Sequence, residues 1–139
     1  MNTDRTLLTT LTPTGGIFIV DFGWPISANV YFSRGFASRT KKGRIWSETI
    51  VDTIWKSLGS DLINWHKPEP LIGGVAVYWE VWKPDDSRVR DVDNFSGKHC
   101  LDVLAKANLI GDDCQVEEEH RYNRGKYKKG QVICTVMEI

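Results

Sequence analysis

The sequence predicts an α/β (α+β) fold in which two main helices pack against a mixed β-sheet of about four strands. Short apolar runs, rich in β-branched residues or alternating with polar ones, indicate the strands. Two longer segments repeat apolar residues at helical spacing. In chain order the elements read β-α-β-α-β-β, which is typical of helices layered on a mixed sheet. With 139 residues, the chain is long enough for one domain, spanning 1–139, with a buried core.

The first half of the chain is expected to contain one strand and one helix. In order we expect a flexible Thr- and Gly-rich lead-in over 1–15, a strand over 16–22, an irregular segment over 23–34, a basic segment over 34–43 and a helix over 44–58. The helix is predicted by a repeating apolar face made of Trp46, Ile50, Val51, Ile54, Trp55 and Leu58. Gly59 is placed to end it in the left-handed conformation.

The second half supplies the other helix and three strands. In order we expect a polar connection over 61–70, an alternating strand over 71–82, a helix over 94–107 and a pair of strands over 115–122 and 131–139, joined by a basic turn containing Gly125 and Gly130. Leu101, Leu104 and Ala105 are expected to face the core. Asn108 is expected to end the helix, because Asn tolerates the left-handed conformation.

The cysteines and the N-terminus favour a cytoplasmic protein with no membrane partner. No CxxC pair occurs among Cys100, Cys114 and Cys134, which favours reduced thiols that are merely buried. The N-terminus lacks a signal-peptide pattern, and the apolar run at 17–20 is too short to cross a bilayer. No common zinc motif matches the spacing of His99, Cys100, Cys114 and His120.

The formal net charge is zero, but the positive charges are concentrated in two windows that hold ten of the 18 Lys and Arg residues. The first window contains Arg34, Arg39, Lys41, Lys42 and Arg44, and the second contains Arg121, Arg124, Lys126, Lys128 and Lys129. Aromatic residues lie among them, and basic segments of this kind contact phosphates, so a nucleic-acid partner is favoured. A solvated loop and hairpin tip would explain the same windows.

Four aspartates bracket the second helix. Asp91 and Asp93 fall where the alternating strand gives way to the helix, and Asp112 and Asp113 fall where the helix gives way to the next strand. A strand end and a strand start can lie side by side in one sheet, so two or three of these carboxylates can converge. Crowded carboxylates raise one another's pKa unless a cation separates them, and Mg2+ prefers oxygen ligands. The competing interpretation is that they cap the helix and form a turn.

These residues carry a resemblance to a known family. The segments that carry it are Pro25-Ile-Ser-Ala-Asn-Val-Tyr31, Arg88-Val-Arg-Asp-Val-Asp-Asn94, Lys98 with Leu101-Asp-Val-Leu104, and Lys106-Ala-Asn-Leu-Ile-Gly-Asp-Asp-Cys-Gln115. Together they resemble the signature of RusA-like Holliday-junction resolvases, from about residue 16 to the end of the chain. The resemblance implies a small homodimeric, Mg2+-dependent endodeoxyribonuclease that resolves four-way DNA junctions in recombination and repair, often encoded by phages or prophages of bacteria.

The resemblance also assigns roles to individual residues. Asp91, Asp93 and Asp113 match the family's catalytic aspartates and would hold Mg2+, for which Mn2+ can substitute, and Lys98 matches its catalytic lysine. Asp102 and Asp112 would lie next to these residues and help to position them, without holding the ion themselves. The DNA-binding residues would be Arg34, Arg39, Lys41, Lys42, Arg44, Arg88, Arg90, Arg124, Lys126 and Lys128. Two departures stand out: Lys98 lies one residue further from Asp93 than in the family pattern, and Asn108 replaces the usual Gly.

Two other functions fit the same residues. One is a catalytically silent module that clamps branched or single-stranded DNA through the basic windows. The other is a metal-dependent nuclease that acts on RNA or on flaps. The silent module predicts tight binding without a metal requirement, whereas either nuclease predicts cleavage that appears only when Mg2+ or Mn2+ is added.

Overall fold

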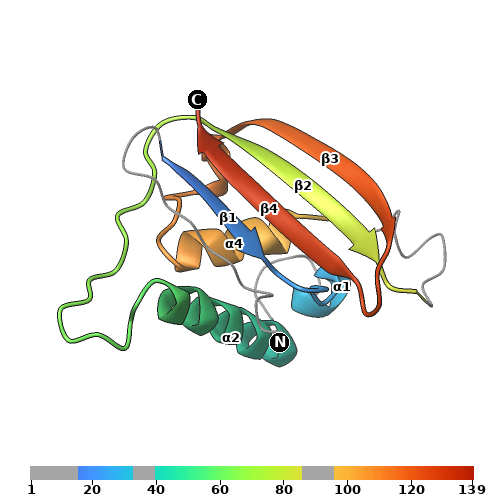
Figure 1. Cartoon of the computed structure of the whole chain (residues 1–139), viewed down its shortest axis with the longest axis horizontal. Coiled ribbons are helices and arrows are strands. Elements are labelled where there is room, and N and C mark those ends of the chain that lie inside the picture. Colours follow the sequence, from blue (N-terminus) through green and yellow to red (C-terminus); the bar gives the residue numbers. More distant parts are fainter. Residues whose placement is uncertain (1–15, 33–39, 86–95) are drawn as a thin grey trace.

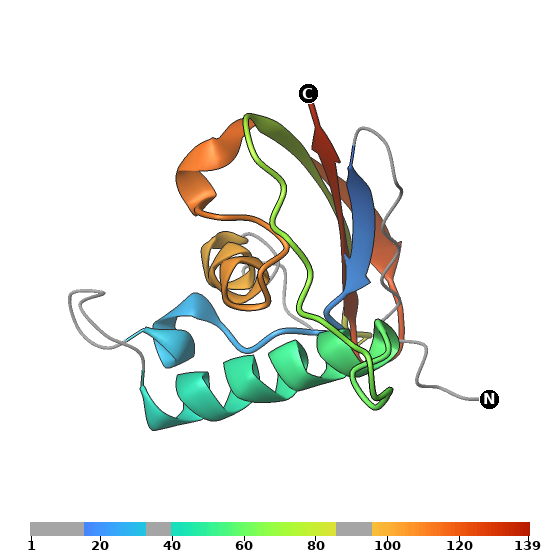
Figure 2. The same cartoon turned by 90° about the vertical axis from the view of Figure 1, so that its left-hand side faces the viewer.

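The computed structural model describes residues 16–32, 40–85 and 96–139. It contains the strands β1 (Ile17–Asp21), β2 (Val75–Lys83), β3 (Val116–Lys126) and β4 (Gln131–Glu138). Its helices are α1 (Ala28–Tyr31), α2 (Lys41–Ser57), α4 (Lys98–Lys106) and the short 3-10 helix η3 (Asp113–Gln115). The strands form one twisted sheet, and the helices lie on one side of it (Figures 1 and 2). The predicted class, a mixed four-stranded sheet with two main helices, is confirmed.

The sheet has the strand order β1-β4-β2-β3. β4 pairs antiparallel with both β1 and β2, whereas β3 pairs parallel with β2. A parallel pair needs a crossover connection, and the segment containing α4 supplies it. The expected pairing of the last two strands with each other was wrong, because β3 and β4 lie on either side of β2.

The turn between β3 and β4 explains this arrangement. Its residues carry the chain across the end of β2 and are held there by backbone hydrogen bonds. The Tyr127 N–H donates to the Lys83 carbonyl at 2.9 Å, and the Asp85 N–H donates to the Lys128 carbonyl at 2.9 Å. The basic turn is therefore docked on β2 and separates the two strands that it connects.

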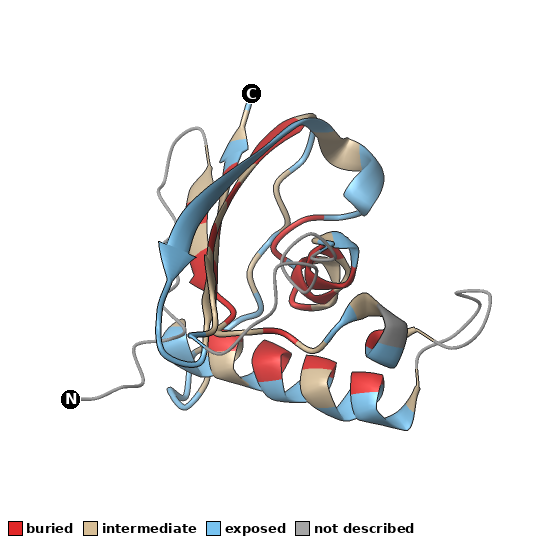
Figure 3. Cartoon of the chain, turned by 90° about the vertical axis from the view of Figure 1, so that its right-hand side faces the viewer, coloured by how far each residue is buried: buried red, intermediate tan, exposed pale blue. Residues whose placement is uncertain are grey.

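One face of the sheet is buried against α2 and α4 (Figure 3). Alternate residues of β2 are buried as predicted, namely Val75, Val77, Trp79 and Val81. They meet a helical layer that includes Ile50 and Ile54 of α2 and Leu101 and Leu104 of α4. β3 differs from the other strands, since ten of its eleven residues are exposed. The helical layer therefore covers β1, β4 and β2 but stops short of β3.

The structure places the start of α2 three residues earlier than expected. Thr40 caps the helix by accepting a hydrogen bond from the Gly43 N–H at 2.9 Å, so part of the supposed basic loop is helical. Gly43 permits close docking on α1, because a Cβ there would lie 2.4 Å from the Tyr31 carbonyl oxygen. The predicted end is confirmed: Gly59 has φ 97°, and the Ser60 N–H donates to the Trp55 carbonyl.

The structure places the start of α4 at Lys98, so the expected start at residue 94 was wrong. Gly97 is its N-cap and packs under the indole of Trp79, since a Cβ at that position would lie 2.3 Å from the ring. The predicted end is confirmed. Asn108 has φ 66°, and the Leu109 N–H donates to the Leu104 carbonyl at 3.0 Å.

Three further boundaries differ from the prediction. The segment 23–34, expected to be irregular, contains α1 within its described part. The regular part of β2 begins at Val75, after an isolated bridge between Leu71 and Ile110. β3 continues to Lys126, so the second basic window lies partly on a strand. None of the helices in the described ranges is long and apolar enough to cross a membrane.

The cysteines follow the prediction at two of three positions. Cys100 and Cys134 are buried, and burial raises the pKa of both thiols well above its usual range. Cys114 is exposed at the turn that precedes β3, so the expectation of a merely buried thiol was wrong there. Cys114 lies in η3, none of whose residues is buried.

Candidate functional site

Two parts of the chain about seventy residues apart meet at α4. The hydroxyl of Tyr31, in α1, donates a hydrogen bond to the carboxylate of Asp102. One turn earlier on α4, Nε2 of His99 lies 2.6 Å from the carbonyl oxygen of Ile26. Because that carbonyl can only accept, Nε2 carries the proton and donates. These two bonds fix the segment around α1 against the first half of α4.

Buried aromatic packing makes this junction rigid. Tyr31 is fully buried and contacts the rings of Trp46 and His99, with centroids 5.8 and 5.5 Å away. Ser27 caps α1 by accepting from the Val30 N–H at 3.2 Å. Tyr31 therefore presents its hydroxyl to Asp102 from a fixed platform, and Asp102 is held in position on α4.

The Gly-Asp-Asp segment forms a capped turn that leads into β3. Asp112 caps η3 by accepting from the Cys114 N–H at 3.1 Å, as the competing turn interpretation expected for this residue. Gln115 completes a capping box by accepting from the N–H groups of Gly111 and Asp112. Its amide also donates to the Leu71 carbonyl at 2.8 Å. The turn is thereby tied to the chain that enters β2.

Several of the predicted charged residues influence the pKa of Asp113. Its pKa is raised, first by a hydrogen bond with the Asp112 carboxyl and then by partial burial and the charge of Asp112. The pKa of Asp112 is lowered, chiefly by the backbone N–H of Cys114. Lys98 lowers the pKa of Asp113 and Asp102 raises it, so both side chains of α4 lie within electrostatic reach. Three of the predicted site residues, Lys98, Asp102 and Asp113, thus share one region.

Several predicted site residues lie outside the described residues. These are Asp91, Asp93, Arg88 and Arg90 before α4, and Arg34 and Arg39 before α2. In the described ranges, no three His, Cys, Asp or Glu side chains converge as a metal site would require. Of the predicted ligands Asp91, Asp93 and Asp113, Asp113 is the member that the structure describes.

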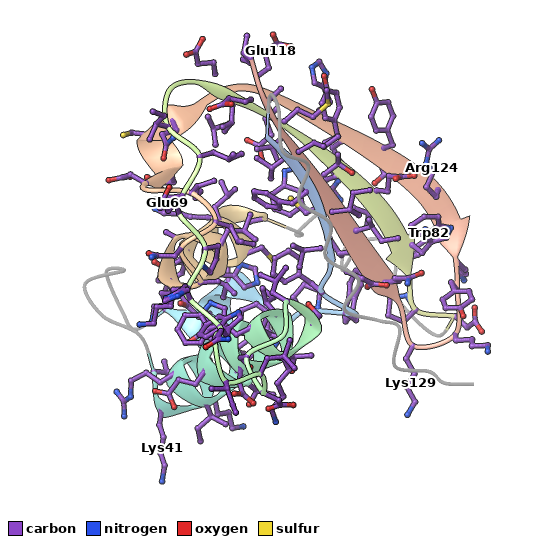
Figure 4. The ribbon with its side chains drawn as sticks, turned by 60° about the vertical axis from the view of Figure 1, so that its left-hand side comes forward. Lys41, Glu69, Trp82, Glu118, Arg124 and Lys129 are labelled. Carbon is purple, nitrogen blue, oxygen red and sulfur yellow. The ribbon has the colours of Figure 1, made fainter. Side chains whose placement is uncertain are left out.

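The described basic residues form two exposed surfaces. Lys41, Lys42 and Arg44 occupy the first turn of α2, where there is no acidic residue. On the other surface, Arg124 stacks on Tyr122 at 5.1 Å and pairs with Glu80 at 3.2 Å. Near it, Lys126 donates to the Asp85 carbonyl, and Lys128 lies over the ring of Tyr127. Figure 4 places Lys41 and Arg124 at opposite sides of the molecule.

A cavity of about 390 Å³, which the sequence did not predict, opens between β2, β3 and the start of α4. It is lined by Trp79, Ser96, Gly97, Glu119, His120 and Arg121. Glu119 accepts a hydrogen bond of 2.5 Å from Trp79 Nε1. The available signal was Glu119 itself, a charged residue directly opposite Val77, a core position of the neighbouring strand.

Comparison with known proteins finds no family model that matches this chain and no similar curated protein.

Proposed function

We propose that this chain is a Mg2+-dependent endodeoxyribonuclease of the RusA-like kind, which resolves four-way DNA junctions by paired phosphodiester hydrolysis. One observation carries the proposal. The separated segments on which the resemblance rests are in contact, through Tyr31 with Asp102 and through Ile26 with His99.

The charges near α4 suit phosphodiester hydrolysis. Asp113, with the proposed ligands Asp91 and Asp93, would supply oxygen donors of the kind that Mg2+ prefers. The pKa of Asp113 is raised chiefly by a hydrogen bond with the Asp112 carboxyl and by partial burial. Bound Mg2+ would supply an activated water and neutralise charge on the phosphoryl oxygens. Lys98 would stabilise the negative charge that develops on the phosphate or the leaving oxygen. Tyr31 would hold Asp102 beside these groups.

The two basic surfaces would position the DNA backbone. Cations in the first turn of a helix oppose the helix dipole, so Lys41, Lys42 and Arg44 have little reason to gather there unless an anion binds. The surface around Arg124 lies on the other side of the molecule. A branched substrate, whose arms diverge, would reach both surfaces more readily than a single duplex.

Cleavage assays on end-labelled four-way junction, duplex and single strand, with and without Mg2+ or Mn2+, test the proposal. We expect paired incisions in the junction alone and only with metal. Asp113→Asn should abolish cleavage while binding persists, because the carboxylate holds the ion but repels phosphate. Lys98→Gln should slow cleavage by about 10²–10³-fold.

The exposed residue Asp61, far from α4 in sequence, provides the control Asp61→Asn, which should cleave like wild type. Tight junction binding with no incision in either metal would replace the nuclease with the silent DNA-binding module. Metal-dependent cleavage confined to RNA or flaps would support metal-dependent phosphodiester hydrolysis and would exclude the four-way junction as the substrate.

A further inference from the structure

The outer edge of β3 has the properties of an interaction surface. Among the described strands, β3 pairs with β2 alone, and nearly all of its residues are exposed along its length (Figure 3). An edge strand presents unpaired backbone N–H and C=O groups that can pair with another strand. At eleven residues, this edge is longer than most strands in globular proteins.

The charges along β3 are divided between its two halves. Glu117–Glu119 form an acidic first half, and Arg121, Arg124 and Lys126 form a basic second half. Two copies of such a strand placed side by side in the parallel direction would set like charges against each other. Placed antiparallel, each acidic half would lie beside the basic half of the other strand. Opposite charges across an antiparallel pair are stabilising, and like charges are destabilising.

We propose that β3 pairs antiparallel with β3 of a second copy of this chain, which joins two sheets across a twofold axis. The pairing of β3 with β2 is irregular only near Glu117 and Arg124, so residues 118–123 form a regular ladder. An axis at His120 would set Glu119 of one copy opposite Arg121 of the other, and the symmetry repeats the pair. Such an interface is isologous, because each copy contributes the same surface.

This inference deepens the proposed function, which requires two active sites for paired incisions, by naming the surface that joins them. Its evidence is the strand edge and its charge pattern, and its test is the mass in solution. If wild type is a dimer through β3 but cleaves no DNA, only the proposed nuclease fails.

The test is sedimentation of two charge-reversal variants. One is Glu117→Lys with Glu118→Lys, and the other is Arg121→Glu with Arg124→Glu. Glu119 is left unchanged because it accepts the hydrogen bond from Trp79. Wild type is expected to sediment as two 15.8 kDa chains and each variant as one. An equimolar mixture of the variants should recover the dimer, because the acidic strand of one meets the basic strand of the other.

The recovery also shows that both variants are folded. Glu48→Lys with Asp61→Lys, two exposed acids away from β3, makes the same change in net charge as the first variant and should leave the dimer intact. Wild type that is monomeric at about 100 µM, where a micromolar dimer would be formed, overturns the proposal and identifies the β3 charges as protection against edge pairing. A dimer that survives both reversals, or variants that fail to recover on mixing, overturns it as well.

Discussion

His99 shows how burial decides the chemistry of a single residue. The ring is 1% exposed, Nε2 donates to Ile26, and Nδ1 makes no hydrogen bond with the described residues. Burial lowers the pKa of His99, and the Ile26 carbonyl and the charge of Asp102 only partly oppose this. The folded protein therefore binds this proton more weakly than the unfolded chain. Stability from neutral His99 is present above about pH 6.5 and is lost as the pH falls below it.

We expect NMR titration to show that His99 protonates at a lower pH than the ordinary histidine value of about 6.5. Chemical denaturation should give a free energy of unfolding that falls by at most about 1.4 kcal/mol per pH unit below pH 6.5 for this one group. A His99 that titrates at or above this ordinary value would contradict the assignment.

The raised pKa of Asp113 has the opposite consequence for stability. The folded protein holds this proton more tightly than the unfolded chain, so stability falls as the pH rises through the interval between the two pKa values. At neutral pH and without metal, Asp113→Asn should therefore stabilise the fold, by no more than about 1 kcal/mol because the carboxyl is exposed to solvent. Thermal melts measure this, with Asp61→Asn as the control.

Mg2+ provides the second arm of that experiment. It should raise the melting temperature of wild type by mass action, and the rise should shrink in Asp113→Asn. A variant that melts below wild type, with no effect of Mg2+ on either protein, would leave Asp113 as part of a turn with no metal to hold.

At the scale of elements, the start of α4 depends on one close approach. Trp79 of β2 is 2% exposed, and its indole occupies the space that any side chain at Gly97 would need. Gly97, the N-cap of α4, has no side chain and therefore lets the helix approach the sheet. Lys98 is the next residue, so the packing of Gly97 against Trp79 fixes the backbone immediately before Lys98.

Gly97→Ala should destabilise the protein by about 1–3 kcal/mol, the usual cost of overpacking a core. Urea denaturation of this variant, of Trp79→Phe and of the double variant forms a thermodynamic cycle. The smaller phenyl ring makes room, so Gly97→Ala should cost less in the Trp79→Phe background. Strictly additive effects would mean that the two residues are not in contact.

At the scale of the whole molecule, the start of α2 and the outer strand present separate basic surfaces. Replacing Lys41 and Lys42 together with Gln should weaken binding to every DNA substrate alike. The slope of log affinity against log salt should become shallower by about one to two, because each phosphate contact contributes about 0.9. Lys56→Gln with Lys67→Gln, which removes two exposed cations beyond the first turn of α2, should leave the slope unchanged. An unaltered slope in the first variant would exclude this surface from the DNA interface.

Local patterns predicted the parts of the fold that depend on neighbours in sequence. The alternation in β2, the apolar face of α2, and the helix ends at Gly59 and Asn108 all follow from side-chain periodicity or from left-handed backbone, and all are confirmed. The start of α4 was missed because its N-cap, Gly97, packs against the ring of Trp79 in β2, a contact that no local pattern predicts.

The sequence by itself determined the mixed α+β class, the main elements and the residues that make this chain a candidate nuclease. Only the tertiary structure decided that the turn after β3 crosses the end of β2, which places β4 on the far side of β2 and leaves β3 at the edge, and that Tyr31 reaches Asp102. The physical reason is range. Periodicity and capping act over three or four residues, whereas strand order and the Tyr31–Asp102 bond depend on which distant surfaces pack together, and no local pattern encodes that choice.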